Sequence, residues 1–348
     1  MDSIFPQYQL NRTIFAEGTE HLFFSGTAYL GISASSEFSA YLKEGIDIYG
    51  TNHGLSRINT VRLRVFEEFE IYFAHHAEAQ KTAVYSSGFL AGHAVVSLLE
   101  NKADAIFVAP HTHPAILSAA IQNQIDPAHN WIDSCIKFAN QNEGKQILLI
   151  ANAVDALKPE IHDFSWVRAL SKNNNYTLLL DDSHAFGAVG EDVFGTYKRW
   201  KELPVDLVIS GSLGKGLGLP AGIILGSHEF IRELTKQSIY RGASPPPPAY
   251  LWAFLQSQEI YRKQQQKLKD NIQFFKKLSQ NLDLQTTKED FPVFRFDDAN
   301  LLQKLQEHQI IISSFPYPSP NDPPVHRIVI SAWHEKEDLL ALVKVLKI

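Results

Sequence analysis

The chain has 348 residues, of which 45% are hydrophobic and 20% charged, and its formal net charge is -6. This length can bury a sizeable core, either in two or three domains or in a large α/β fold with a smaller appended layer. The negative charge gives no electrostatic reason to expect a nucleic acid or an anionic membrane as a partner.

Cys135 is the only cysteine, which excludes an intrachain disulfide framework and a cysteine metal cluster. The first five residues lack the basic and apolar regions of a signal peptide. No apolar segment approaches the roughly 18 to 20 residues that span a bilayer. We therefore expect a cytoplasmic protein.

Short β-rich runs alternate with helix-length segments through the middle of the chain. Gly88 opens a segment of helical composition over residues 90–99, and a helix that begins after a glycine turn is a ready phosphate site. The β-rich runs are residues 105–109, 146–151, 176–181, 207–211 and 222–225. This alternation predicts a buried, mostly parallel sheet with helices on its faces.

The composition changes at the four prolines of residues 245–248. Beyond them, the pattern predicts a long polar helix over about 250–282, strands at 293–296 and 310–312, and a final helix over 336–346. We therefore place a domain boundary just before these prolines, between a large domain over 46–244 and a small α+β domain over 245–348. We also expect an N-terminal segment over 1–45 that packs with the small domain.

The most informative pattern pairs an acidic strand end with a lysine. An apolar run at residues 177–180 ends in Asp181, and 34 residues later Lys215 lies in the glycine-rich loop 211–218. A lysine can form a Schiff base with the aldehyde of pyridoxal 5'-phosphate (PLP), and an acid at the carboxyl end of a parallel strand can keep the pyridine nitrogen protonated. The pattern thus indicates PLP chemistry. A surface lysine on a flexible turn, beside an acidic strand end, is the alternative.

The same loop also suggests a non-enzymatic protein that binds a phosphate or a nucleotide. Lys215 is followed by Gly216, however, so the Gly-Lys-Ser/Thr ending of a nucleotide-binding P-loop is absent. A Mg²⁺ ion would then lack its hydroxyl ligand. We therefore favour an enzyme.

Short motifs are spread over nearly the whole chain, at residues 28–31, 50–57, 87–89, 113, 181–184, 211–218 and 327–334. In this order the set resembles the α-oxoamine synthases, which are PLP-dependent acyl-CoA:amino acid C-acyltransferases, and most of all their 8-amino-7-oxononanoate synthase and 2-amino-3-ketobutyrate CoA ligase branches. The resemblance implies the type I fold of aspartate aminotransferase. That fold has a large α/β domain, with a mostly parallel seven-stranded sheet between helices, and a small α+β C-terminal domain.

The resemblance implies four roles around the cofactor ring. Lys215 would be the Schiff-base lysine and also the base that removes the substrate's α-proton. Asp181 would pair with the pyridine nitrogen, His184 would hydrogen-bond the phenolic oxygen, and His113 would stack on the ring face. His184 as a satisfied buried histidine is the alternative for that residue. The alternative that His111 and His113 bind a metal ion is weaker than the stacking role, because the sequence spacing indicates no third ligand. We therefore predict no metal.

The resemblance also assigns the cofactor's phosphate group. The backbone N–H groups of Gly88 and Phe89 and the hydroxyl of Ser212 would hold it, and Ser244 would add a contact from the partner subunit. We therefore expect a homodimer with the active site at the interface, in which residues 50–57 lie near the partner's cofactor.

Two further residues are assigned to the substrates, an amino acid and an acyl-CoA thioester. Arg327 would grip the amino acid's carboxylate, because a guanidinium forms a bidentate pair with that planar anion. Solvation on a surface strand is the alternative for Arg327. Ser319 would line the acyl pocket.

One departure from the family pattern concerns the acyl-CoA half of the reaction. Family members carry a Ser-Met-Asp-Gly-Asp-like loop after the central strand, whereas residues 150–157 run straight to Pro159 and the serine has no counterpart. An aminotransferase or a lyase on the same scaffold, with no use of CoA, is therefore the alternative function.

Overall fold

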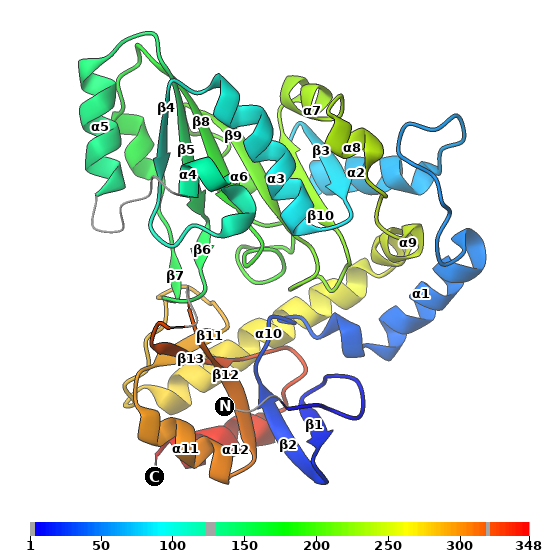
Figure 1. The fold of residues 1–348 in the computed structure, drawn as a ribbon. Helices are drawn as coiled ribbons and strands as arrows, with labels where there is room; N and C mark the ends of the chain where they lie inside the picture. Colours follow the sequence, from blue (N-terminus) through cyan, green and yellow to red (C-terminus); the bar gives the residue numbers. More distant parts are fainter. Residues whose placement is uncertain (1–3, 123–129, 318–320, 348) are drawn as a thin grey trace.

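The computed structural model describes residues 4–122, 130–317 and 321–347. The ribbon has an upper α/β part and a lower part in which both termini lie (Figure 1). Within the described ranges, no helix combines the length and the apolar character that crossing a bilayer requires.

A six-stranded sheet forms the centre of the upper part (Figure 1). Its order is β3 (Lys81–Tyr85), β10 (Gly222–Gly226), β9 (Asp206–Ser212), β8 (Asn175–Asp181), β5 (Gln146–Asn152) and β4 (Ala105–Val108). The neighbours from β4 to β9 pair in parallel, whereas β10 runs antiparallel to both β9 and β3. The mostly parallel sheet is thus confirmed.

The number of strands differs from the expectation. The described part of the chain contributes six strands to this sheet rather than seven. All five predicted β-rich runs are strands, and the pattern missed β3. β3 begins with the polar pair Lys81 and Thr82, so its short apolar stretch gave no distinct signal.

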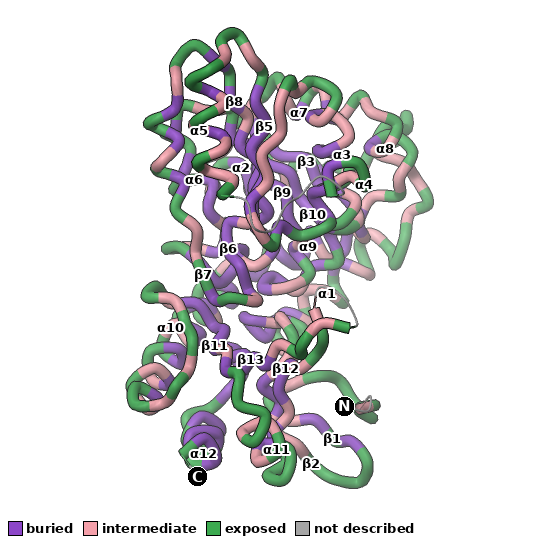
Figure 2. Tube along the Cα trace, turned by 60° about the vertical axis from the view of Figure 1, so that its left-hand side comes forward, coloured by how far each residue is buried: buried purple, intermediate pink, exposed green. Residues whose placement is uncertain are grey.

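The two faces of the sheet carry separate apolar clusters, because successive side chains of a strand point to opposite faces. On β5, Leu148 and Ile150 join a cluster with α3 (Gly88–Leu99), whereas Leu149 joins the cluster that contains α2 (Arg64–Ala77). These two helices therefore cover opposite faces (Figure 1). Buried residues follow the strands through the middle of the molecule (Figure 2), which explains why the strands read as continuous apolar runs.

A second, five-stranded sheet forms the lower part. Its order is β1 (Thr13–Ala16), β2 (Thr19–Phe24), β12 (Ile310–Pro316), β13 (Pro324–Val329) and β11 (Val293–Phe296). β2 pairs in parallel with β12, so the N-terminal strands and the C-terminal strands share one sheet. The domain boundaries after residues 45 and 244 stay predictions.

Two helices replace the single helix expected over about 250–282. α9 (Pro248–Gln256) is separated by Ser257 from α10 (Gln258–Ser279). The Ser257 hydroxyl donates a hydrogen bond of 2.6 Å to the carbonyl of Ala253, and such bonds compete with the helical ladder. α9 packs on α1 (Ser36–Tyr49) and α2, whereas α10 contacts α12 (Lys336–Leu346), which has the predicted bounds.

The remaining elements are short or lie at the edges. They are the helices α4 (Ala119–Gln122), α5 (Trp131–Gln141), α6 (Tyr197–Trp200), α7 (His228–Leu234), α8 (Ser238–Gly242) and α11 (Ala299–Glu307), the strands β6 (Val154–Asp155) and β7 (Glu160–Ile161), and the 3-10 turns η1 (Ile32–Ala34), η2 (Glu100–Lys102), η3 (Pro114–Ile116) and η4 (Ser165–Ala169).

Candidate active site

Lys215 lies in the loop that follows β9, at the carboxyl ends of the parallel strands. Its Nζ is 2.8 Å from Nε2 of His184. The loop approaches the backbone after β8 so closely that a Cβ on Gly216 would lie 2.2 Å from the carbonyl oxygen of Phe186. Glycine at this position therefore lets the loop bring the lysine to His184.

Partial burial lowers the pKa of Lys215. The charge of Asp181 raises this pKa and the charge of Arg327 lowers it further, and the lowering effects prevail. A neutral amine is the nucleophilic form of lysine, so this environment suits covalent attachment to an aldehyde and the removal of a proton.

His184 is held between two partners. Its Nδ1 is 2.7 Å from the hydroxyl of Tyr29, and its Nε2 faces Lys215. Burial lowers the pKa of His184 well below its usual range, and the charges of Lys215, Arg327 and His113 lower it further. His184 is therefore a neutral imidazole in this site.

Asp181 and Asp182 end β8 with different surroundings. The buried Asp181 accepts a 2.7 Å hydrogen bond from the backbone N–H of Ser183, and its charge acts on both Lys215 and His113. Asp182 instead accepts hydrogen bonds from the backbone and the hydroxyl of Thr196, at 2.6 and 2.8 Å. Asp181 is thus the acid that shares a site with the lysine.

His113 follows β4 and is positioned by Asn152, at the end of β5. The Asn152 side chain accepts a 2.9 Å hydrogen bond from the backbone N–H of His113 and donates one of 2.8 Å to the carbonyl of His111. Burial lowers the pKa of His113, Asp181 raises it, and Lys215 lowers it. Among the residues described, no three histidine, cysteine or acidic side chains gather into a group that could hold a metal ion.

The predicted phosphate site lies where α3 begins. The Ser87 hydroxyl caps the helix by accepting from the backbone N–H of Leu90 at 3.2 Å. The N–H groups of the first helical residues, Gly88 and Phe89, have no acceptor within the helix, so they are free to bind an anion. A Cβ on Gly88 would lie 2.5 Å from the Cβ of Ser212, so this glycine lets the helix start meet the lysine loop.

Arg327 lies on β13, in the lower sheet, and is buried. Its Nη1 donates a 3.0 Å hydrogen bond to the carbonyl of Ala156, and its guanidinium lies 5.0 Å from the ring centre of Phe315. Its Nε is buried and has no hydrogen-bond partner in the described chain. Because its charge also acts on His184 and Lys215, the strand brings this free donor toward the lysine site.

These residues match the chemistry of PLP. The helix start, with Gly88 packed on Ser212, offers a compact cradle for a phosphate group, and a buried carboxylate, a neutral imidazole and a nucleophilic amine lie at the strand ends beside it. The site therefore fits the cofactor that the sequence motifs indicate.

Two predicted residues are not placed in this site. Ser319 lies outside the described residues. Ser244 is exposed between α8 and α9, and no hydrogen bond links it to the site residues in the described part of a single chain. Their roles stay predictions.

Sequence reasoning missed Tyr29 and Asn152. Tyr29 stands in one of the family motifs, at residues 28–31, and Asn152 is the last residue of an apolar strand. Both positions carried a signal, but their contacts join segments that lie far apart in the sequence, and a single sequence does not show such contacts.

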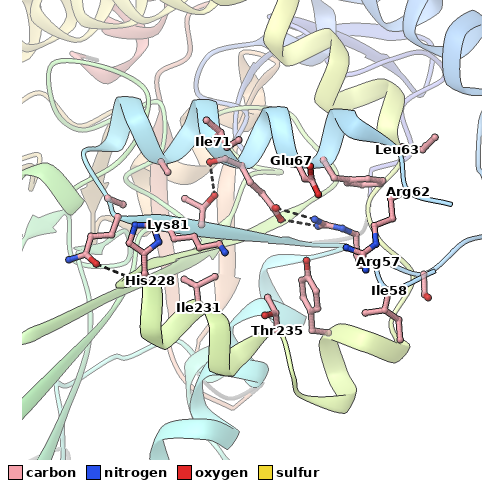
Figure 3. Close-up of a pocket in the computed structure, with 18 of the residues that line it drawn as sticks. Arg57, Ile58, Arg62, Leu63, Glu67, Ile71, Lys81, His228, Ile231 and Thr235 are labelled. Atoms are coloured by element: carbon pink, nitrogen blue, oxygen red, sulfur yellow. Dashed lines mark hydrogen bonds and ion pairs between the residues drawn. The ribbon is translucent and has the colours of Figure 1, made fainter. Parts of the chain in front are cut away.

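A large cavity lies elsewhere, between α2 and the helices α7 and α8 (Figure 3). It measures about 660 Å³, and Arg57 and Glu70 form a bidentate ion pair at its wall, with N–O distances of 2.9 and 3.0 Å. The residues that line it include Ile58, Val61 and Tyr240, and none of the residues around Lys215. The segment 50–57, predicted to lie near the partner's cofactor, thus borders this cavity.

The comparisons with known proteins agree with this fold and site. The chain matches the family model for aminotransferase class I and II over residues 28–346, and it belongs to that family. This is a family of PLP-dependent enzymes, so PLP is the cofactor of the class.

Particular relatives give a finer likeness. The chain is 25% identical over 349 residues to the 8-amino-7-oxononanoate synthase of Aliivibrio fischeri, covering 95% of this chain and 89% of the relative. A solved serine palmitoyltransferase from Sphingomonas wittichii aligns with a TM-score of 0.83 at 18% identity, over 99% of this chain and 91% of the other. The 8-amino-7-oxononanoate synthase of Francisella tularensis aligns with a TM-score of 0.73 at 21% identity, over 94% and 96%. These solved structures establish the type I fold.

Proposed function

We propose that this protein is a PLP-dependent C-acyltransferase that condenses an amino acid with an acyl-CoA thioester, as an α-oxoamine synthase of the 8-amino-7-oxononanoate synthase type. The observation that carries the proposal is the contact of Lys215 with His184 at the strand ends, within the electrostatic reach of Asp181 and Arg327. Curated relatives that match over nearly the whole chain support the acyltransferase class.

The cofactor, when bound, supplies an electron sink for the bond that breaks at the amino acid's Cα. Lys215 would hold the cofactor covalently, and its Nζ would be the base at the substrate's Cα, because burial lowers its pKa and favours the unprotonated amine. The carboxylate of Asp181 would pair with the cofactor's pyridine nitrogen, and His184 would hydrogen-bond its phenolic oxygen. His113 would cover the face of the cofactor ring.

Arg327 binds the amino acid's carboxylate. Its Nη1 is already held by the carbonyl of Ala156, which fixes the plane of the guanidinium, and its buried Nε has a free donor. A guanidinium fixed in this way loses little side-chain freedom when it binds a carboxylate. Ser319 lining the acyl pocket, and Ser244 reaching the partner's phosphate group, complete the proposed substrate and cofactor contacts.

The proposed enzyme is a cytoplasmic homodimer. Three apolar side chains border the cavity between α2 and α7: Ile58 and Val61 on the loop before α2, and Ile71 on that helix, with exposed fractions of 39%, 61% and 70%. Burying such a patch against a second subunit stabilises association. The segment 50–57 would then face the active site of the partner.

Thioester-dependent turnover tests the proposal. The PLP-loaded protein is given glycine, alanine or serine with a panel of acyl-CoA thioesters, and released CoA is measured with a thiol reagent. The protein adds no background to this assay, because Cys135 is fully buried and burial raises the pKa of its thiol to about 12. We expect CoA release with one amino acid, and a loss of about 10²–10⁴-fold in Lys215→Ala.

A matched control is Lys344→Ala, which removes an exposed lysine on α12 and is expected to leave turnover unchanged. Amino-group transfer to an oxo acid, or bond cleavage without any thioester, would replace the proposal with the aminotransferase or lyase function. The short hairpin of β6 and β7, where the family's serine loop is expected, is the feature that keeps this alternative in view.

A further inference from the structure

Tyr29 is a buried tyrosine at the Lys215 site that the sequence motifs left without a role. Its side chain is 1% exposed, and its hydroxyl lies 2.7 Å from Nδ1 of His184. On the other side of the same imidazole, Nε2 lies 2.8 Å from Nζ of Lys215. The three groups therefore form a continuous chain of hydrogen bonds that ends at the reactive amine.

The position of Tyr29 is fixed by its neighbours. Its backbone carbonyl accepts a 2.8 Å hydrogen bond from the N–H of Ala332, and its ring meets the ring of Phe291 edge-on at 6.0 Å. Tyr29 is thus anchored in the segments next to the lower sheet, while its hydroxyl reaches His184 after β8 in the upper part. A rigid anchor of this kind can orient the imidazole.

The geometry also decides where the protons lie. In the described chain, His184 Nδ1 is the only hydrogen-bond partner of the Tyr29 hydroxyl. Burial raises the pKa of Tyr29 well above its usual range, so the phenol keeps its proton, and a buried O–H without an acceptor is unfavourable. The hydroxyl therefore donates to Nδ1.

A neutral imidazole has one N–H, so a lone pair at Nδ1 places the proton on Nε2. Nε2–H then points at Lys215, whose pKa burial lowers, and the unprotonated amine that this favours has the lone pair to accept it. In the proposed cofactor site, the same Nε2–H would donate to the cofactor's phenolic oxygen.

We propose that Tyr29 is a positioning residue that holds His184 in the Nε2–H tautomer, so that the imidazole presents a proton donor to Lys215 and to the cofactor's phenolic oxygen. The inference rests on the proposed cofactor site and is independent of the acyl-CoA chemistry. Tyr29 acts through His184 and does not itself reach the reacting atoms.

Nitrogen NMR of the cofactor-free protein tests the tautomer directly. The protein is labelled with ¹⁵N-histidine, and the His184 signals are identified as those missing in His184→Gln. We expect wild-type His184 to show a protonated Nε2 and an unprotonated Nδ1. In Tyr29→Phe we expect averaged signals from both tautomers. A proton on Nδ1 in the wild type, or an unchanged tautomer in Tyr29→Phe, overturns the inference.

The matched control is Tyr176→Phe, which removes a 2.8 Å hydrogen bond from a tyrosine hydroxyl to the carbonyl of Ser171, away from Lys215. Its His184 signals are expected to match the wild type. The wild-type spectrum alone decides the tautomer, so the inference stays testable even if Tyr29→Phe folds poorly.

A second readout uses the PLP-loaded protein. Because a hydrogen bond donated to the phenolic oxygen stabilises its deprotonated form, Tyr29→Phe should raise the midpoint of the pH titration of the visible absorption band by about one pH unit. An unshifted midpoint contradicts the inference. The Nε2–H tautomer together with no CoA release under any condition would overturn the proposed acyltransferase function and leave the role of Tyr29 intact.

Discussion

The consecutive carboxylates of Asp181 and Asp182 have opposite environments although they are neighbours in the chain. Asp181 faces the lysine site, whereas the fully buried Asp182 is enclosed behind β8 with Thr196. Burial raises the pKa of Asp182 to about 7, against the hydrogen bonds from Thr196, which lower it. Asp182 is therefore a structural acid that favours its protonated form in the folded protein.

This environment gives a pH-dependent stability. The folded pKa of Asp182 lies above the unfolded value of 3.8, so its contribution is fully present below pH 3.8 and is lost as the pH rises to about 7. Asp182→Asn removes the titration and keeps the shape. Between pH 5 and pH 7, we expect the wild type to lose about 2–3 kcal/mol of stability relative to the variant.

Urea unfolding at both pH values measures this difference. A wild-type-to-variant stability difference that stays constant from pH 5 to pH 7 would show that Asp182 is ionised in the folded protein across this range.

Some residues of the candidate active site could be predicted from the sequence alone, and others could not. Lys215 and His184 could be found in it because each stands in a short motif, and the structure brings them into contact. Tyr29 and Asn152 act through hydrogen bonds to residues 155 and 39 positions away. Such contacts depend on how distant strands and loops meet, so motif reading did not reveal their partners.

At the scale of elements, the junction of α3 with β9 shapes the proposed phosphate site. The nearest atoms to a Cβ on Gly88 would be Cβ, Cα and N of Ser212, at 2.5, 2.6 and 2.7 Å. Because two of these are backbone atoms, no side-chain rotation relieves the contact. The helix start and the lysine loop therefore have one relative position.

Gly88→Ala tests this junction. The higher helix propensity of alanine stabilises the variant by at most about 1 kcal/mol, whereas overpacking against the backbone of Ser212 costs about 1–3 kcal/mol. We therefore expect the folded protein to be less stable overall. The shifted N–H groups should also weaken PLP binding. Thermal unfolding and a PLP titration measure the two effects.

Gly242→Ala is the matched control, since nothing lies within 4 Å of a Cβ at that position, and it should be neutral. Wild-type affinity for PLP in Gly88→Ala would mean that the phosphate group is held elsewhere.

The elements themselves were predicted unevenly. Five of the six strands were found because they read as short apolar runs, and the four inner ones, β10, β9, β8 and β5, are largely buried as well. α12 was found by its apolar period. The break between α9 and α10 was missed, because a serine is compatible with a helix in the sequence. Only the structure shows that the Ser257 backbone, at φ -108° and ψ 25°, leaves the helical conformation. Strand β3 was missed because its first two residues are polar.

At the scale of the whole molecule, the apolar border of the cavity between α2 and α7 is the candidate subunit interface. Val61→Glu places a charge in this border. Because an unpaired charge in an apolar interface is costly to desolvate, we expect the variant to shift from dimer to monomer. Sedimentation velocity at several protein concentrations measures the change.

Leu340→Glu is the control. Leu340 is also a large apolar side chain, with 49% exposure, but it lies on α12, away from the cavity between α2 and α7. It should leave the sedimentation of the protein unchanged. A Val61→Glu protein that sediments as the wild type does would move the proposed interface away from this cavity.

The organisation of the whole chain was only partly visible in the sequence. The alternation of strands and helices predicts the parallel sheet, and the comparisons confirm the type I fold. The sharing of one sheet by β2 and β12 was not visible, because this parallel pairing joins residues near opposite ends of the chain. This pairing supports the expectation that the N-terminal segment packs with the small domain, and the division into domains stays a prediction.

The solitary, enclosed thiol of Cys135 makes the chain a convenient subject for spectroscopic labelling. It lies within α5, where reagents in solution do not reach it. Cysteines introduced at exposed positions in the upper and lower parts would therefore be the only sites to accept a fluorophore or a spin label. Paired labels could then measure how far the two parts move when substrates bind, with the native cysteine left in place.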